Sequence, residues 1–453
     1  MKKFLATYLA FLSLVCIGAV SCSQSEDEAV VELSPYALVK SFSLGNIRSA
    51  YPSFTATGKD TTIVMTMTME DFPFTINQQT GEIFNNDSLP FATNVTKVVA
   101  NLSAEGVPAL YVDSIGEYVA YSNSDSIDFT SPRKLRVYSS DAKYYKDYTI
   151  TINVHQLNPD RMVWSKSVAI EAVTPVRALE HNGSMCLFGT KENALVVAMT
   201  PIEGEPQWVV MDVVGLPANA ELSTVNVFKG VFYVIADGDL YTSSDAIAWA
   251  PVLAGKDLVT ILVSSDDAGE MVVANAGELF STKDGVSFLY SGDLPAGLPL
   301  YGVSAVSYPL SHNDKMVRYM AVGYDSPAKD GKARVWSKIS NEDEWVDYEN
   351  AGNPYACPSL KGLAVVRFDN LLYAMGGAGK ANGCDVGAFA SFYISKDNGI
   401  TWKVPADFYH AIPEELSGSD EPFAVAVDSN NFMWIINTGN TWKTIINRLG
   451  FKK

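Results

Sequence analysis

The sequence predicts an all-β protein, in which an Ig-like or cadherin-like β-sandwich is followed by a six-bladed β-propeller. Three observations support this fold class. Apolar and polar residues alternate with a period of two in many short runs, such as Tyr148–Val154. Large aromatic residues recur every 39–57 residues in the second part, which brackets the length of a four-stranded blade. The stretch Ser395–Trp402, SKDNGITW, matches the Asp-box pattern of propeller hairpins.

The chain begins with the features of an exported lipoprotein. The apolar run Phe4–Val20 is too short for a membrane span, and we assign residues 1–21 to a signal peptide. Cys22 ends a stretch that resembles a bacterial lipobox and is the expected lipidation site; a secretory signal with a chance cysteine is the alternative. The acidic run Ser23–Glu28 resembles the signal that sends Bacteroidetes lipoproteins to the cell surface, although a solvated tether would also be acidic. We therefore expect residues 22–33 to be a lipidated tether on an outer-membrane protein that faces the exterior.

Composition argues against two classes of partner. The chain has 51 acidic and 33 basic residues, a formal net charge of −18, and such a surface repels phosphate backbones. We therefore expect no nucleic-acid partner, and contact with the membrane only through the lipid anchor. The five cysteines and four histidines form no CxxC motif or Cys/His cluster, so we expect no metal and no cofactor.

Residues 34–156 read as seven or eight short strands without a helical period, as in a sandwich domain. The run Thr61–Met69, TTIVMTMTM, alternates with period two and is expected to form a half-buried strand. Leu157–Asp160 then combines a proline with polar residues and ends the last strand. The remaining residues, 157–453, are expected to form the propeller.

The propeller repeat is marked by an aromatic residue that leads the fourth strand of each unit. After Trp402 the chain supplies three strands but no aromatic residue that would begin a fourth strand. Trp164, in contrast, begins a fourth strand that is not preceded by the first three strands of a unit. We therefore expect Arg161–Lys166 to join the last blade and close the ring, which removes a free sheet edge. The leaders are Trp164, Trp208, Trp249, Phe288, Trp345 and Trp402.

The residues of the Asp box are expected to be structural. The Asp397 carboxylate can accept hydrogen bonds from its own turn, Gly399 can supply a positive φ, and Trp402 can fill the space between blades. Ser395 opens the motif, and a catalytic role for Asp397 is the alternative. Weaker copies of the motif stand at Ser281–Phe288 and Thr242–Trp249.

Candidate ligand-binding residues lie in the loops of the two longest repeat units. The insertions Tyr324–Ala333 and Gly376–Gly387 should emerge on the same face as the connections Asn350–Ser359 and Asp407–Pro422. Binding residues often lie on loops that a rigid scaffold holds, although ordinary polar loops are the alternative. The side chains expected around one end of the channel are Tyr355, Lys380, Asn382, Asp385, Phe408, Tyr409 and His410.

The cysteines of the mature chain suggest one disulfide on that face. Cys357 lies in the connection between the two longest units, and Cys384 lies in the insertion of the second, so the two could be bridged. Two loop cysteines that lie close by chance and stay reduced are the alternative. Cys186 stands in an apolar run and is expected to be a buried, free thiol.

The phrases FTINQQTGEIFNNDSLPFATNVTKVV (Phe74–Val99) and WKTIINRLGF (Trp442–Phe451), with the lipobox and the domain order, resemble a family of Bacteroidetes lipoproteins of unknown function. The resemblance covers nearly the whole mature chain and implies a fold and a location, but no activity. Sialidases also combine six blades with Asp boxes, yet their early Arg-Ile-Pro phrase is absent here.

The leading hypothesis is a non-enzymatic surface protein that binds a glycan or a peptide, or acts as a scaffold. A glycan-active hydrolase or lyase with its site at the channel mouth is the alternative, and a periplasmic assembly factor is a third possibility.

Overall fold

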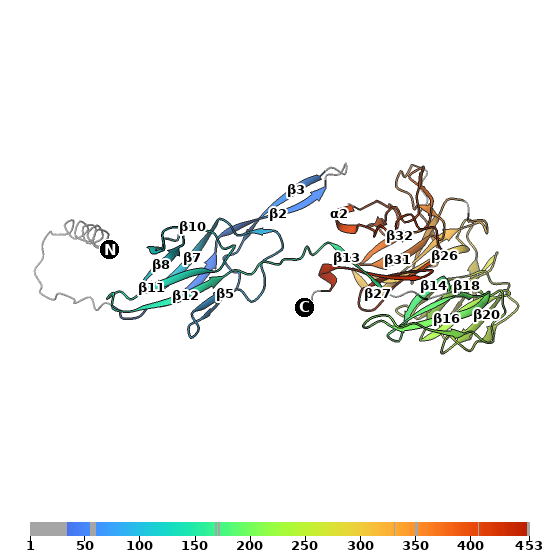
Figure 1. Ribbon diagram of the computed structural model, residues 1–453. Helices are drawn as coiled ribbons and strands as arrows, with labels where there is room; N and C mark the ends of the chain where they lie inside the picture. Colours follow the sequence, from blue (N-terminus) through green and yellow to red (C-terminus); the bar gives the residue numbers. More distant parts are fainter. Residues whose placement is uncertain are drawn as a thin grey trace, which may run out of the picture. The chain divides into compact units, whose positions relative to one another are not determined.

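The computed structural model describes residues 34–54, 60–167, 170, 173–329, 331–348, 352–405 and 407–450. The predicted signal peptide, the predicted lipidation site Cys22 and the predicted acidic tether lie outside the described residues. The first of two compact units ends at Gln156, and the second holds Leu157–Lys453 (Figure 1). Helical structure in the described part is limited to α2 (Asp407–His410) and the 3-10 turn η1 (Asn447–Leu449).

The first unit packs two β-sheets around one hydrophobic core. One sheet has the order β1-β7-β10 and the other β4-β5-β12-β11-β8-β9, in which β12 runs parallel to β5 and antiparallel to β11. Both sheets supply fully buried side chains, among them Leu44 and Leu135. A third sheet has the order β3-β2-β6. The strands are β1 (Leu38–Leu44), β2 (Asn46–Phe54), β3 (Asp60–Thr68), β4 (Thr75–Asn77), β5 (Glu82–Phe84), β6 (Thr93–Asn94), β7 (Val98–Glu105), β8 (Val107–Val112), β9 (Glu117–Ala120), β10 (Ser126–Ile127), β11 (Arg133–Tyr138) and β12 (Tyr145–Thr151).

The alternation of apolar and polar residues correctly predicted which side chains of β12 are buried, but its prediction of a half-buried strand was wrong for β3. Tyr148 and Ile150 are buried, at 2% exposure each, as their spacing indicates. In β3, by contrast, Ile63 and Val64 are 50% and 59% exposed, so most of this strand is not half-buried. Of the run Thr61–Met69, only Met67 and Met69 pack against the hydrophobic core, so among the described residues no core layer covers Ile63 and Val64.

The second unit is built from antiparallel sheets whose first strands contact one another in sequence. Four sheets have the orders β14-β15-β16-β17, β18-β19-β20-β21, β22-β23-β24-β25 and β26-β27-β28-β29. Two more have the orders β31-β32-β35 and β13-β38-β37-β36, and the bridge between Ile394 and Lys403 extends the first of these. The first strands make contact in the order β14, β18, β22, β26, β31, β36, and β36 also contacts β14. A small additional sheet, β30-β33-β34, belongs to the loops.

The bounds of these strands are β13 (Met162–Ser167), β14 (Thr174–His181), β15 (Ser184–Lys191), β16 (Ala194–Pro201), β17 (Val209–Asp212), β18 (Glu221–Phe228), β19 (Val231–Ala236), β20 (Asp239–Ser243), β21 (Ala250–Leu253), β22 (Thr260–Ser265), β23 (Glu270–Ala274), β24 (Glu278–Thr282), β25 (Leu289–Asp293), β26 (Tyr301–Leu310), β27 (Asn313–Tyr324), β28 (Arg334–Ile339), β29 (Val346–Asp347), β30 (Ser359–Leu360), β31 (Ala364–Phe368), β32 (Leu371–Met375), β33 (Gly379–Ala381), β34 (Cys384–Val386), β35 (Tyr393–Ser395), β36 (Phe423–Val427), β37 (Met433–Asn437) and β38 (Asn440–Ile446).

Strand β13 pairs antiparallel with β38, which places Trp164 opposite Thr444. Trp164 is only partly buried. Its ring stacks on Phe392 with centroids 6.2 Å apart, and its Nε1 donates to the backbone oxygen of Ala411 over 2.8 Å. Because part of the ring remains in water, we expect Trp164 to contribute less to stability than a fully buried tryptophan would.

The turn Ser395–Trp402 is held by hydrogen bonds within itself. Asp397 Oδ1 accepts from the backbone amide of Thr401 and the hydroxyl of Ser395, each over 2.8 Å. Gly399 has φ +93°, and Trp402 is fully buried with Nε1 bonded to the Gly399 oxygen. Burial raises the pKa of Asp397, but the hydrogen bonds from Thr401 and Ser395 outweigh it and hold that pKa below its ordinary value.

Related turns occur at Ser281–Phe288 and Thr242–Trp249. Asp284 accepts from two backbone amides of its turn, and Gly285 has φ +78°. In the third turn, Ala246 takes the glycine's place with φ +64°, a conformation that costs an alanine free energy.

Candidate functional site

The candidate site is a cavity of about 1090 Å³ between the sheet that contains β28 and the small sheet β30-β33-β34. Its walls come from the β27–β28 loop, the connection that leads into β30, and the β33–β34 hairpin. We call it the inter-sheet cavity. Its volume matches the upper range of pockets that enclose small molecules.

The structure brings together some of the predicted ligand-binding residues and separates the others. Tyr355, Lys380 and Asn382 line the inter-sheet cavity. Asp385 lies opposite Lys380 in the β33–β34 register but does not line the cavity. Tyr409 and His410 lie on α2 and do not line it either. The side chain of Phe408 lies outside the described ones.

Main-chain and hydroxyl contacts fix the walls of the inter-sheet cavity. The Tyr324 hydroxyl donates to the backbone oxygen of Leu360 over 2.8 Å, which ties β27 to β30. The amide of Ala333 donates to the Ser359 hydroxyl over 2.9 Å, which ties the β27–β28 loop to the same strand. The two loops are thereby held to one scaffold, so the cavity is largely formed before a ligand arrives.

The Ser395–Trp402 turn supports the connection that leads into β30. The backbone amide of Trp402 donates to the oxygen of Tyr355 over 2.8 Å, and Asn353 Nδ2 donates to the oxygen of Ile400 over 2.7 Å. Tyr355 is thus fixed at its backbone while its side chain is 42% exposed. The Lys403 ammonium lies 4.9 Å from the centre of the Tyr355 ring.

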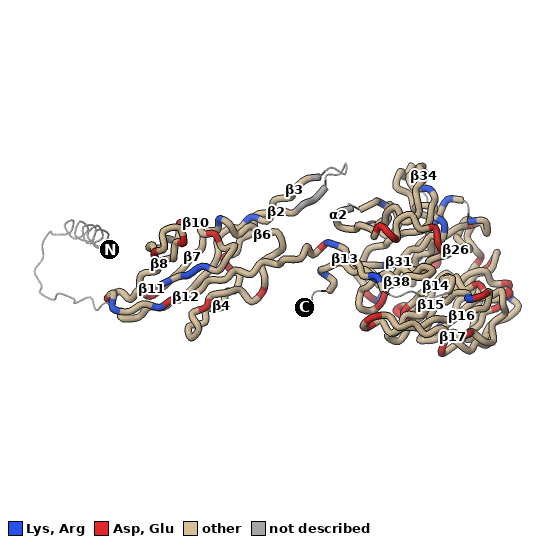
Figure 2. The backbone as a smooth tube through the Cα atoms, in the orientation of Figure 1, with Lys and Arg blue, Asp and Glu red and all other residues tan. Residues whose placement is uncertain are grey.

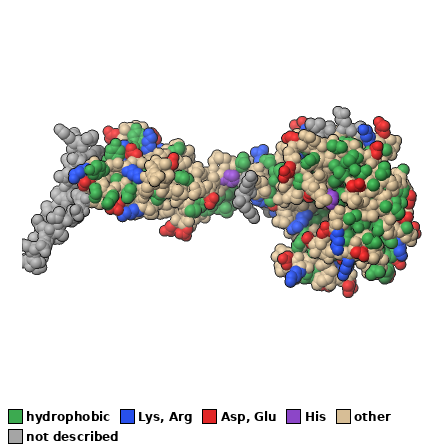
Figure 3. Space-filling view, turned by 90° about the horizontal axis from the view of Figure 1, so that it is seen from below, with side chains coloured by type: hydrophobic (Ala, Val, Ile, Leu, Met, Phe, Trp, Pro, Cys, Tyr) green, Lys and Arg blue, Asp and Glu red, His purple; other side chains and the backbone are tan. Residues whose placement is uncertain are grey.

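Positive charge dominates the described lining of the inter-sheet cavity. Arg334 is paired with Asp347 over 2.8 Å. The other four cations make no ion pair with a carboxylate in the described part of the chain. Figure 2 shows blue Lys and Arg segments on loops beside β34, whereas acidic and basic side chains are interspersed on the face of the second unit seen in Figure 3. The four unpaired lysines are Lys329, Lys332, Lys361 and Lys380.

Sequence reasoning missed three of these four lysines. The four lysines come from three segments that are separated along the chain, and only the folding of the chain brings these segments to one cavity. A lone lysine in a polar loop carries no signal by itself. The insertion Tyr324–Ala333, which does lie between β27 and β28 as predicted, was the available signal for Lys329 and Lys332.

The predicted bridge between Cys357 and Cys384 is not formed in the structure, where both are free thiols. Cys357 packs at the edge of the hydrophobic cluster that contains Trp402, and burial raises its pKa. Cys384 is exposed at the start of β34, so the two cysteines lie in different environments. Cys186 is buried and free as predicted, and burial raises its pKa to about 12.

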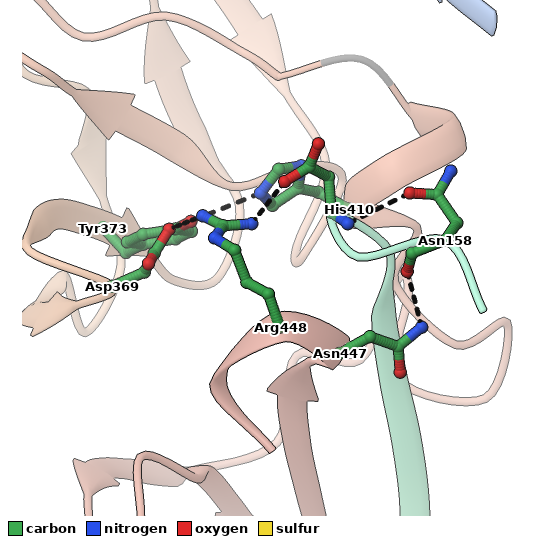
Figure 4. Close-up of polar contacts among 7 residues, drawn as sticks. Asn158, Asp369, Tyr373, His410, Asn447 and Arg448 are labelled. Atoms are coloured by element: carbon green, nitrogen blue, oxygen red, sulfur yellow. Dashed lines mark hydrogen bonds and ion pairs between the residues drawn. The ribbon is translucent and has the colours of Figure 1, made fainter. Parts of the chain in front are cut away.

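His410 lies in a second polar cluster, against β32 and the C-terminal turn η1 (Figure 4). Its Nε2 lies 3.2 Å from the hydroxyl of Tyr373, and its buried Nδ1 has no hydrogen-bond partner among the described residues. Burial, with a contribution from Arg448, lowers the pKa of His410 to about 4. The histidine is therefore neutral at physiological pH.

Arg448 joins three parts of the second unit. Its guanidinium pairs with Asp160, just before β13, at 2.6 Å, and with Asp369 in the β31–β32 turn. The neighbouring Asn447 donates from Nδ2 to the backbone oxygen of Asn158 over 2.7 Å. The C-terminal phrase NRLGF therefore contains the residues that fasten the end of the chain to the start of this unit.

In the described residues, we found no group of three or more His, Cys, Asp or Glu side chains that could hold a metal ion. Nor does any helix in the described part reach the length and apolar character needed to cross a bilayer.

These features define an all-β protein with a β-propeller domain. Residues 158–453 match the family model described as the DUF6242 beta propeller domain, and residues 42–152 match the DUF6242 N-terminal domain. The chain therefore belongs to the DUF6242 family, a family of unknown function. The predicted resemblance to such a family is confirmed to that extent, while the lipoprotein character stays a prediction.

Several solved structures resemble the chain weakly, and no curated protein matches it. A DUF4623 family protein from Bacteroides eggerthii is 12% identical, with a TM-score of 0.35, over 89% of this chain and 98% of that protein. Virginiamycin B lyase from Staphylococcus aureus is 11% identical, with a TM-score of 0.36, over 63% of this chain and 99% of that enzyme. An alpha-L-arabinanase from Penicillium chrysogenum is 12% identical, with a TM-score of 0.36 and coverage of 63% and 99%. Likenesses this weak carry no argument about activity.

Proposed function

We propose that this protein is a lipid-anchored, non-enzymatic binding protein of the outer membrane, displayed at the cell surface, with its ligand site in the inter-sheet cavity. In this proposal the first unit is an Ig-like spacer. The second unit is a six-bladed propeller in which β13 completes the last blade and the three aspartate turns are Asp boxes.

The inter-sheet cavity is the observation that carries the proposed binding function. It combines a preformed volume with an exposed aromatic ring at Tyr355 and with lysines that no described carboxylate neutralises. Preformed walls lower the entropy lost on binding, and an exposed tyrosine offers contact area at little conformational cost. These properties support a site that holds a ligand by surface contact.

The blade assignment has support of its own. The first strands make contact in sequence and β36 returns to β14, as blades around a common axis would. The export and surface location are supported by the sequence alone, through the apolar signal, Cys22 and the acidic run behind it.

A binding panel with the full-length protein in detergent tests the proposed function. The protein is passed over immobilised glycans and peptides, and reducing ends and free termini are assayed in parallel for turnover. We expect retention of at least one class without turnover, and a Kd about 10-fold weaker for Tyr355→Ala, since a lost aromatic contact costs roughly 1–3 kcal/mol.

The matched control is Tyr144→Ala, which removes an exposed tyrosine from the first unit; this side chain is 61% exposed, against 42% for Tyr355. This variant should bind like the unaltered protein. Equal loss in both variants, or turnover of a retained glycan, would refute the assignment of a non-enzymatic site to the inter-sheet cavity.

A further inference from the structure

We infer that the inter-sheet cavity is selective for an acidic glycan, that is, an oligosaccharide with carboxylate or sulfate groups. This inference rests on the proposed function and specifies the ligand of the same site.

The described part of the cavity lining is basic, whereas the chain as a whole is acidic. In proportion to the whole sequence, with 51 acidic and 33 basic residues of 453, its twenty-five lining residues would contain about three acidic and two basic ones. The described lining instead contains five basic residues and no Asp or Glu, while Asp330 and Glu349, which adjoin lining residues in the sequence, lie outside the described residues. Such a local reversal of sign attracts anions and concentrates them at the cavity.

Most of the described basic residues of the lining have no described carboxylate as a partner. Arg334 has Asp347 as its partner, but the ammonium groups of Lys329, Lys332, Lys361 and Lys380 have no described carboxylate within ion-pair distance. Like charges that share a cavity repel one another, so an anion that binds among them gains their attraction and relieves that repulsion. These lysines would therefore stabilise a ligand that carries negative charge.

The remaining lining groups suit a sugar better than a peptide. The exposed ring of Tyr355 can stack against the apolar face of a pyranose, and the exposed amide of Asn382 can exchange hydrogen bonds with hydroxyl groups. A peptide would need a free strand edge or a pocket for an apolar anchor. Two large apolar side chains of the lining, Tyr324 and Leu360, offer little surface to such an anchor, because they are only 2% and 4% exposed.

The overall charge of −18 disfavours a long, densely charged polymer, because the rest of the surface repels it. A short or sparsely charged chain, with one or two acidic sugars inside the cavity, avoids this repulsion. We therefore expect binding to saturate with short acidic oligosaccharides and to weaken with added salt.

The test measures the Kd of the full-length protein, in detergent, for four probes: polygalacturonate oligomers, dextran sulfate oligomers, unmodified dextran oligomers and poly-L-glutamate. Polygalacturonate and dextran sulfate compare carboxylate with sulfate groups. Dextran is a glycan without charge, and poly-L-glutamate carries carboxylates on a peptide. We expect at least one of the two acidic glycans to bind more than 10-fold tighter than dextran and poly-L-glutamate.

The variant Lys361→Ala/Lys380→Ala should weaken that binding about 10-fold, since exposed charge pairs contribute up to about 1 kcal/mol each. The control Lys191→Ala/Lys315→Ala removes two exposed lysines from other sheets and should change the Kd less than 2-fold. Tryptophan fluorescence and the unfolding temperature should be unchanged in both, so that a loss of binding is not a loss of folding.

Three other outcomes of this experiment would each contradict one part of the inference. Binding of dextran that is insensitive to the lysine variants but sensitive to Tyr355→Ala would leave the proposed function standing and remove the acidic selectivity. Preference for poly-L-glutamate over every glycan would reject the sugar. Failure of all four probes to bind would refute this inference, while the wider panel described above decides separately on the proposed function.

Discussion

The buried histidine His410 predicts an acid-sensitive propeller. In the folded chain its pKa is about 4, against 6.5 for an ordinary histidine, because burial disfavours the charged ring. Between pH 6.5 and pH 4 the unfolded chain therefore binds a proton at this site that the folded chain does not. The stabilisation is fully present above pH 6.5, is lost as the pH falls towards 4, and then levels off.

The size of the effect follows from the two pKa values. One pKa unit corresponds to about 1.4 kcal/mol, so the interval from 6.5 to about 4 corresponds to about 3 kcal/mol of unfolding free energy. Asp369 acts in the opposite direction: burial raises its pKa, so the folded state takes up its proton first as the pH falls. A comparison with a variant at position 410 is needed to isolate the histidine.

Urea unfolding of the full chain and of His410→Gln, between pH 8 and pH 4, measures this effect. All eight tryptophans lie in residues 157–453, so their fluorescence reports on the propeller alone. Glutamine cannot be protonated and can still reach the Tyr373 hydroxyl. The difference in unfolding free energy between the two proteins should be constant above pH 7 and shift by about 3 kcal/mol, to the disadvantage of the histidine, by pH 4. Parallel curves at all pH values would refute the buried, neutral state of His410.

Four further predictions concern the anchor and the packing of the second unit. Cys22→Ser should move the protein from the membrane fraction to the soluble one, and persistence in the outer membrane would refute lipidation. Gly399→Ala should lower the unfolding free energy by about 3 kcal/mol in urea titrations, because φ is +93° and a methyl group would meet neighbouring side chains at 2.7 and 3.0 Å. Trp402→Ala should cost about 3–5 kcal/mol and Trp164→Ala roughly half as much, since only the first is fully buried; equal costs would contradict this. Arg448→Ala should cost about 1 kcal/mol, as partly exposed ion pairs do, and should raise the pKa of His410 in an NMR titration.

Local patterns predicted local features well. The period of two identified the buried side of the strand that holds Tyr148 and Ile150, and an apolar run identified the buried thiol of Cys186. These properties depend on the neighbouring residues and on one adjacent sheet. Ile63 lies in the same kind of alternating pattern, yet its side chain is exposed. Alternation along a strand does not show whether another layer of the protein covers that strand.

The candidate site was predictable only in part. A connection between units pointed to Tyr355 and a loop insertion pointed to Lys380, and both residues do line one cavity. His410 was assigned to the same place because its connection reaches the same face, but its short helix packs against β32 and the C-terminal turn instead. Spacing along the chain gives the side of a sheet from which a loop emerges, and it does not give the direction in which the loop then folds.

The pairing of β13 with β38 imposes an order of events on the synthesis of this protein. Thr444 bonds to the backbone oxygen of Val163, a residue made 281 positions earlier. At typical rates of translation, β13 waits roughly 15–60 s for its partner strand. A chain that stops short of β38 leaves one sheet without its third strand and β13 without any neighbour. The second unit therefore cannot reach its final form while it is still being made.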